Sequence, residues 1–130
     1  MKAFGIAALV LLAGCSTHRP QSRVLGQAFS LPHGESVAIR SEGLTVAFTE
    51  VNEDSRCPTG ATCITAGQAS VTLRLAKSAS DISVLLTIPG DANAEFEGYT
   101  VTLLDLLPYP SIGHALRPEE YAASLLVERR

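Results

Sequence analysis

The residues with the clearest chemical potential form one short segment, in which Asp54, Ser55 and Arg56 directly precede Cys57. In an extended segment Asp54 and Arg56, two positions apart, project to the same side. Their charged groups can then pair, or the guanidinium of Arg56 can bind loop carbonyls with its fork of N–H donors. The alternative is presentation to a partner, because loops on rigid scaffolds often carry recognition residues. Asp54, Ser55 and Arg56 are therefore a candidate interaction loop, with internal pairing as the structural alternative.

Catalytic motifs are not evident elsewhere. Ser111 lies close to His114 in the sequence, but in a Pro/Gly-rich loop without a nucleophile elbow, and Asp105 would meet His114 only through the fold. The chain contains no phosphate loop, zinc-binding helix motif or dinucleotide fingerprint. We therefore predict that the protein is not an enzyme and needs no cofactor.

A metal site has weak support. Glu50, Glu53 and Asp54 supply carboxylates, but without the regular spacing of a calcium loop. The three histidines are scattered singly along the chain. We predict no metal ligand, and keep a small-ligand or metal-binding module as an alternative function.

The N-terminus has the pattern of a secretory signal peptide. Lys2 is followed by an almost wholly apolar run over residues 3–14, which ends in small residues. At about 1.5 Å per residue a helix over this run would be roughly 18 Å long, against about 30 Å for the hydrocarbon core of a bilayer. The run is therefore too short to span a membrane, and residues 1–14 are expected to be a signal peptide.

The segment Leu12-Ala13-Gly14-Cys15 resembles the lipobox of bacterial lipoproteins. The resemblance implies cleavage before Cys15, a diacylglyceryl thioether on its sulfur, and further acylation, for example with palmitate. Two or more acyl chains give stable membrane anchoring. The expected location is the bacterial cell envelope and, since Ser16 rather than Asp follows Cys15, the outer membrane facing the periplasm in a Gram-negative host.

Residues 15–26 are polar and are expected to form a lipidated tether, leaving residues 27–130 as one domain. The chain has 130 residues, of which 46% are hydrophobic, so a single folded core is expected. The net charge of −3 argues against nucleic acid as a partner. The expected partners are the membrane, through the lipid on Cys15, and an envelope protein or the cell wall.

With Cys15 assigned to the lipid, Cys57 and Cys63 remain as an even pair in an oxidising compartment. Pro58 and Gly60 favour a turn between them, so we predict a disulfide that closes a short loop. By the chain-entropy model such a loop contributes about 2 kcal/mol. A metal site is the rival interpretation of the two cysteines.

Residues 53–67 resemble a family of small, mostly uncharacterised bacterial lipoproteins and secreted proteins. The matching signature is Asp-Ser-Arg-Cys-Pro, a short loop, Cys, two residues and Ala-Gly, which here ends at Ala66 and Gly67. An aromatic residue, usually Trp, is expected two positions after the second Cys, and this chain has Thr65 there. The resemblance implies location and fold, and no enzyme activity.

Alternating apolar and polar residues predict short strands over 36–39, 44–50, 69–75, 82–88, 99–103 and 121–127. One helical turn is expected over 117–120, where Pro118 suits a first helical position. Six or seven strands in about 100 residues favour an all-β fold, an antiparallel β-sandwich of immunoglobulin-like size, with a small β-barrel as the alternative. Asp105 lies in phase with the inward face, so we expect the strand from Tyr99 to end there. A bulge before Asp105, or burial of a hydrogen-bonded Asp105, would also resolve the conflict.

The predicted function is that of an anchored envelope lipoprotein with a structural or protein-interaction β domain. A protease-inhibitor-like loop between Cys57 and Cys63 is a weaker alternative, because the loop offers only small residues. Phe29, Tyr109 and Tyr121 are candidate interface anchors if exposed and core residues if buried. An exposed Tyr109 beside Arg56 would favour a binding face.

Overall fold

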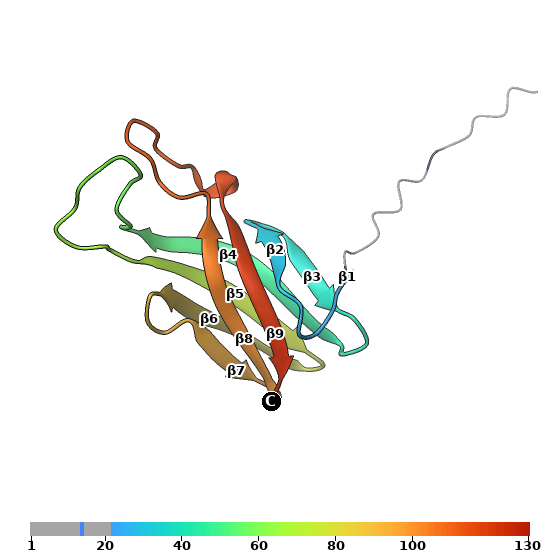
Figure 1. The fold of residues 1–130 in the computed structure, drawn as a ribbon. Helices are drawn as coiled ribbons and strands as arrows, with labels where there is room; N and C mark the ends of the chain where they lie inside the picture. The colour runs from blue at the N-terminus through green and yellow to red at the C-terminus, as the bar shows by residue number, and fades with distance from the viewer. Residues whose placement is uncertain (1–13, 15–21) are drawn as a thin grey trace, which may run out of the picture.

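The computed structural model describes Gly14 and residues 22–130, which form two packed β-sheets (Figure 1). The first sheet has the strand order β1-β3-β4-β5-β6 and the second β2-β9-β8-β7. The strands are β1 (Ser22–Arg23), β2 (Phe29–Pro32), β3 (Ser36–Ile39), β4 (Leu44–Asp54), β5 (Ala69–Lys77), β6 (Ser80–Ile88), β7 (Asn93–Phe96), β8 (Tyr99–Leu107) and β9 (Ala122–Arg129).

The predicted β-sandwich is confirmed, since the two sheets stay separate and do not close into a barrel. Within the described residues, neighbouring strands are antiparallel apart from the short parallel pair of β1 and β3. This pair shows that Ser22 and Arg23, which fall in the segment predicted to be the tether, belong to the sandwich. Leu25 also packs against the core, so the domain starts earlier than residue 27.

Inward-facing residues of both sheets form the core, as alternation predicts. The clearest cases are β5, which buries Val71, Leu73 and Leu75, and β9, which buries Leu125 and Val127. The alternation predicts burial less well in β6, an edge strand. Its Leu86 is buried, but Ile82, which the pattern places on the inner face, is 40% exposed, because β6 lies at the margin of the first sheet.

Two irregularities in β4 set the orientation of its last residues. The register against β5 shifts between Phe48 and Glu50 and again between Val51 and Glu53. After each shift the inward position moves by one residue. Val51 and Asp54 therefore turn toward the second sheet, and the side chain of Asp54 is buried.

A bulge in β8 resolves the conflict at Asp105. The register against β9 shifts between Leu103 and Asp105, so the extra residue Leu104 points outward and Leu106 takes the buried position. The expectation that the strand ends at Asp105 is thus wrong, because β8 continues to Leu107. The carboxylate of Asp105 accepts a hydrogen bond from the backbone N–H of Leu106, at 2.8 Å.

The helical turn predicted over 117–120 is present as a 3₁₀ helix over Pro118–Glu120. No helix in the described part of the chain is long and apolar enough to cross a membrane. The signal peptide over 1–14 and the lipidated Cys15 lie outside the described residues, except for Gly14.

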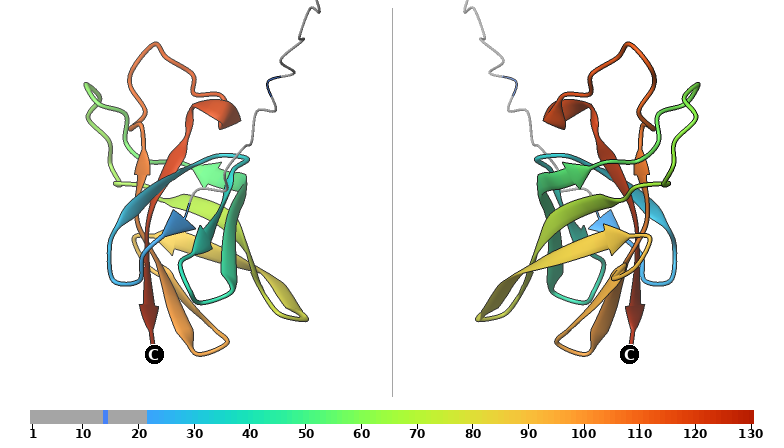
Figure 2. Two further views of the ribbon diagram at one scale, coloured as in Figure 1. Left: turned by 90° about the vertical axis from the view of Figure 1, so that its right-hand side faces the viewer. Right: turned by 90° about the vertical axis from the view of Figure 1, so that its left-hand side faces the viewer.

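The two longest loops meet at one end of the sandwich (Figure 2). The hairpin loop between β4 and β5 and the segment between β8 and β9 lie together there, and the C-terminus lies at the opposite end. The predicted interaction loop belongs to this end, which we call the loop end.

Candidate interaction site

The β4–β5 hairpin continues beyond its strands into the loop. The N–H of Ser55 donates to the carbonyl of Gln68 (2.8 Å), and the N–H of Cys57 to that of Ala66 (3.0 Å). Gly67 lies between these two pairs with φ +70°, and a Cβ there would stand 1.8 Å from the carbonyl oxygen of Ser55. Glycine is therefore required at this close approach of the two chain segments.

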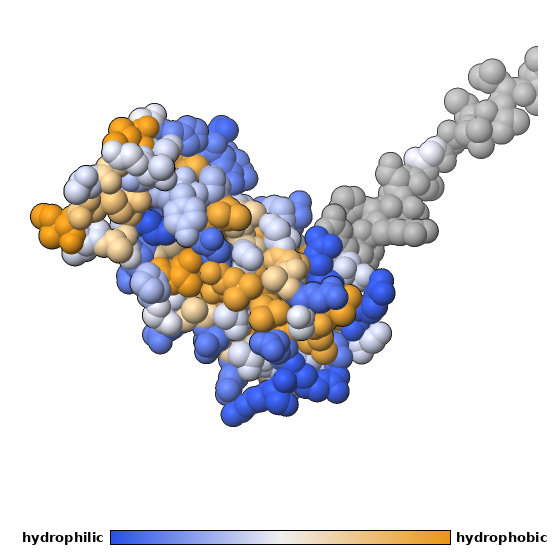
Figure 3. All heavy atoms as spheres, viewed as in Figure 1, coloured by the Kyte–Doolittle hydropathy of each residue, from blue (hydrophilic) through white to orange (hydrophobic). Residues whose placement is uncertain are grey.

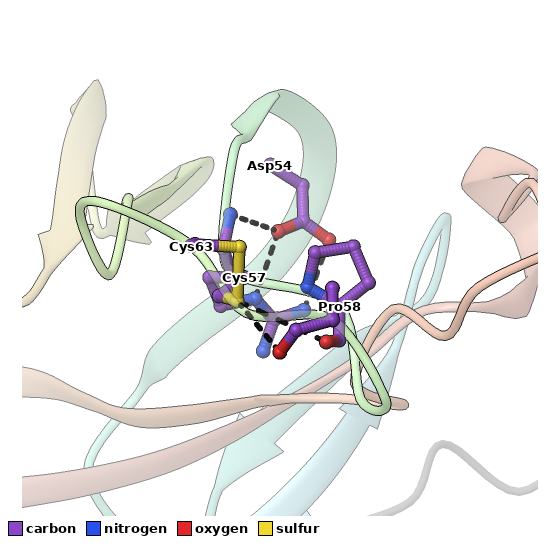
Figure 4. Close-up of a disulfide and its surroundings, with 6 residues drawn as sticks. Asp54, Cys57, Pro58 and Cys63 are labelled. Atoms are coloured by element: carbon purple, nitrogen blue, oxygen red, sulfur yellow. Dashed lines mark hydrogen bonds and ion pairs between the residues drawn. A yellow bond between two sulfur atoms is a disulfide. The ribbon is translucent and has the colours of Figure 1, made fainter.

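The predicted disulfide between Cys57 and Cys63 is present and closes the tip of this hairpin, beside the Asp54 carboxylate (Figure 4). The Cα atoms of the two cysteines are 5.9 Å apart. The disulfide therefore fixes the tip where the backbone ladder ends.

Asp54 and Arg56 form a buried ion pair below the loop. Nε of Arg56 donates to Oδ1 of Asp54 at 2.8 Å, and Nη2 donates to Oδ2 at 3.0 Å, a bidentate arrangement. Each side chain is only 8% exposed. The internal pairing that the two-residue spacing favours is thus present.

Arg56 also connects the two sheets. Its Nη1 donates to the carbonyl of Leu106 in β8 at 2.6 Å, and its Nη2 to the carbonyl of Pro108 at 3.2 Å. The hydroxyl of Tyr121, the residue before β9, donates to Oδ2 of Asp54 at 2.8 Å. A single charged pair therefore joins the end of β4 in one sheet to β8 and β9 in the other.

Burial and hydrogen bonding around this pair shift the pKa values of Asp54 and Tyr121. Burial by itself raises the pKa of Asp54, but the hydrogen bonds from Arg56 and Tyr121 outweigh it and hold the pKa below its ordinary value of 3.8. Burial, together with the hydrogen bond to Asp54, raises the pKa of Tyr121 to about 12. At neutral pH the aspartate is charged and the tyrosine is protonated, the states that the hydrogen bonds require.

Tyr109 covers Arg56 from the outside. The guanidinium carbon lies 4.6 Å from the centre of the Tyr109 ring, a cation–π contact, and the Tyr109 hydroxyl donates to Asp105 at 3.1 Å. Tyr109 is nevertheless 53% exposed, whereas Phe29 and Tyr121 are buried. Of the three aromatic candidates, Tyr109 is the one that the fold leaves on the surface, next to Arg56.

A second loop joins the first. The N–H of Thr59 donates to the carbonyl of Pro110 at 2.8 Å, and Thr59 and Ser111 form a parallel bridge. Ile64 at the tip of the first loop is fully exposed, and Ile112 at the tip of the second is 65% exposed. Figure 3 shows hydrophobic groups at both tips.

The tips of the two loops carry no charged side chain. Residues 57–67 and 106–113 contain no Asp, Glu, Lys or Arg, although these types make up 18% of the chain. We call the exposed side chains of Ile64, Tyr109 and Ile112 the loop-end surface. This surface is uncharged and apolar, and it lies above the buried Arg56 contacts and the disulfide that hold the two loops.

An open cleft of about 600 Å³ lies beside this surface. Ile88 and Pro89, at the end of β6, line the cleft together with Leu104, Asp105 and Tyr109. Arg56, Cys57 and Gly67 also line the cleft. It can accept an apolar side chain between Leu104 and Ile88, with the Asp105 carboxylate at its margin.

The third member of the predicted interaction loop, Ser55, is exposed and has a local role. Its hydroxyl donates to Glu53 and to the carbonyl of Gln68 at 3.1 and 3.2 Å. Glu53 also accepts a hydrogen bond from the Gln68 amide at 2.9 Å. Because Glu53 pairs on the outer face while Asp54 faces inward, these carboxylates do not converge on a shared site.

The remaining catalytic and metal candidates also lie apart. Ser111 and His114 are linked through their backbones, and the His114 ring contacts Glu120 at 3.3 Å while Asp105 bonds Tyr109. Among the described residues, no group of three or more His, Cys, Asp or Glu side chains is placed to hold a metal ion.

Sequence reasoning identified Tyr109 as a candidate but missed Ile64, Ile112 and Leu104. The available signal was the absence of charge over residues 57–67, together with an isoleucine directly after Cys63. A large apolar residue in a polar turn segment has no partner along the chain to bury it, which favours a surface role.

No family model, curated protein or solved structure matches this chain. The resemblance of residues 53–67 to small lipoproteins therefore stays a prediction.

We predict that Arg56→Ala lowers the free energy of unfolding by about 3 to 5 kcal/mol, because it leaves Asp54 buried and unpaired. Urea unfolding followed by circular dichroism measures the loss. Arg74→Ala is the matched control, since Arg74 forms an Arg–Asp pair with Asp81 in which the side chains are 59% and 41% exposed. Equal effects of the two substitutions would contradict the role assigned to the buried pair.

The lowered pKa of Asp54 predicts that the free energy of unfolding falls in acid as Asp54 becomes protonated. A carboxyl group whose pKa is lower in the folded state stabilises the protein at pH above its unfolded pKa. This contribution is lost as the pH falls from the ordinary value of 3.8 through the lower folded pKa. In Asp54→Asn the acid-side decline in unfolding free energy should be shallower, as measured by urea titrations over a pH series. An unchanged decline would show that Asp54 does not supply this sensitivity.

Proposed function

We propose that this protein is a lipid-anchored bacterial envelope lipoprotein whose β-sandwich binds another envelope protein through the loop-end surface. The location is supported by the sequence, through the lipobox-like segment that ends at Cys15. The binding role is supported by geometry, and the observation that carries it is Tyr109, half exposed and stacked on the buried Arg56.

The composition of the loop-end surface fits a protein partner. The cores of protein interfaces are depleted in charge and enriched in aromatic residues. Tyr109 and the two exposed isoleucines match this pattern, and each isoleucine buried on binding contributes roughly 1.5 to 3 kcal/mol. The cleft beside Tyr109 supplies a pocket for an apolar side chain of the partner.

The rigidity of the support also favours binding. The disulfide, the ladder bonds of Ser55 and Cys57, and the bond from Thr59 to the second loop restrain both tips before any partner arrives. A preorganised surface loses less conformational entropy on association. The structure thus provides what a binding module needs, whereas the buried Asp54 and Arg56 act by supporting the surface rather than by touching the partner.

The anchoring part of the proposal predicts the mass of the protein purified from membranes. The intact mass should correspond to loss of residues 1–14 and addition of acyl chains at Cys15, because the lipobox-like segment directs both steps. Cys15→Ser should release the protein from the membrane fraction. An unmodified Cys15 in the membrane-purified protein would refute the anchoring, while leaving the binding role open to its own test.

The proposed binding role predicts that substitution of the exposed isoleucines at the loop tips weakens capture of the partner. Native protein is crosslinked in its envelope and captured beside an Ile64→Ser/Ile112→Ser variant, whose substitutions lie at exposed positions and leave the fold intact. At least about a tenfold loss of the captured partner is expected, equivalent to ~1.4 kcal/mol. Val24→Ser is the control, because Val24 is an exposed apolar residue (43%) outside the two loops. A partner retained by the loop variant, or none captured by the native protein, would refute the binding role.

A further inference from the structure

The four edge strands of the sandwich differ in how well they are protected. The first sheet ends at β1 and β6, and the second at β2 and β7. β1 has two residues, and β2 and β7 have four each, whereas β6 has nine. Among the described residues, β6 is thus the one long edge.

The outward backbone groups of β6 can be assigned from its contacts. The N–H of Thr87 donates to the carbonyl of Asp91, 2.8 Å away and outside the β5–β6 ladder. The side chains of Ser70 and Thr87 meet at 2.9 Å, as expected for a pair that is not hydrogen-bonded through its backbone. By alternation, the N–H and C=O groups of Ser83 and Leu85 also point away from β5.

The usual devices that block a sheet edge are missing from most of β6. Residues 82–88 contain no charge, proline or glycine, and the single charge of the strand, Asp81, pairs with Arg74 of β5. Other edges are better blocked, since Pro32 ends β2 and Glu95 of β7 binds Arg130 at 3.0 Å. Leu85 is 58% exposed and Ile82 is 40% exposed on this edge.

Access to the edge is open over its first half. Near its C-terminal end β6 adjoins the second sheet, where Ile88 and Pro89 line the cleft together with Leu104 of β8. Figure 2 shows the turn between β5 and β6 standing apart from the turn between β7 and β8. A further strand can therefore approach Ser83 and Leu85 without displacing an element of the domain.

We infer that β6 pairs with β6 of a second copy of this chain, antiparallel and centred on Val84, to form a homodimer with one continuous sheet. This register places Ser83 of each copy opposite Leu85 of the other, so that their free backbone groups bond. On the inner face Val84 meets Val84, and Ile82 meets Leu86.

The strand is self-complementary in this register, which is why the occupant is a second copy. Each inner-face position of residues 82–86 meets another apolar side chain, and cross-strand apolar pairs stabilise a sheet. The two Asp81 carboxylates lie at opposite ends of the pairing, so like charges do not meet. The inference is independent of the loop-end surface, because β6 lies at a different edge.

The test is cysteine crosslinking of the full chain in membranes of producing cells. Val84→Cys brings two thiols face to face at a pair that is not hydrogen-bonded, a separation that a disulfide can span. After mild oxidation, a non-reducing gel should show about tenfold more crosslinked dimer than Thr45→Cys, because pairing raises the effective thiol concentration. Thr45 is the matched control, an exposed residue of the central strand β4.

A second variant separates pairing from chance collision. Ile82→Lys adds an inward-pointing charge at a partly exposed edge position, which a monomer tolerates and a paired edge does not. Combined with Val84→Cys, it should abolish the excess dimer while the circular dichroism spectrum stays unchanged. The inference is overturned if Val84→Cys crosslinks no more than Thr45→Cys, if Ile82→Lys leaves the dimer intact, or if the adduct contains a different protein.

Discussion

The bidentate pair between Arg56 and Asp54 is the interaction on which the loop end of the sandwich depends. It is buried, and it links the last residue of β4 to the carbonyls of Leu106 and Pro108 in the other sheet. A buried ion pair is a weak source of net stability, because desolvation offsets most of the attraction. Its value here is geometric, since it fixes how two sheets and two loops meet, and it fails if either partner is removed.

This constraint also explains the arrangement of the surface. Tyr109 packs on the guanidinium of Arg56 and bonds Asp105, so its ring is held in place although half of it faces solvent. The charged pair of Asp54 and Arg56 thus lies beneath the surface, where it orders the loops, while the tips at Ile64 and Ile112 carry no charge. Support and recognition are divided between buried polar and exposed apolar residues.

Sequence periodicity predicted the sandwich and six of the nine strands of the described residues, because strands follow local patterns. The disulfide followed from the even pair of cysteines and the turn residues between them. Periodicity missed β1, β2 and β7, three short edge strands, and the bulges, which break the period. The pairing of Asp54 with Arg56 followed from their spacing. The carbonyls that complete the site lie about fifty residues away along the chain, and no local pattern indicates them. The exposure of Tyr109 likewise depends on how two distant loops pack.

The paired register shifts in β4 have a consequence for how this hairpin can evolve. Each shift is a one-residue insertion that reverses the inside and outside of every later position. Two together cancel, so that Phe48 and Asp54 both face inward. Deletion of an inserted residue, Thr49 or Asn52, would remove its bulge and leave the later pairs with β5 unchanged, so Asp54 would stay opposite Ala69 and keep its contact with Arg56. Straightening one bulge without losing a residue would instead turn Asp54 to solvent. Single-residue length changes at Thr49 and Asn52 are therefore expected among related proteins.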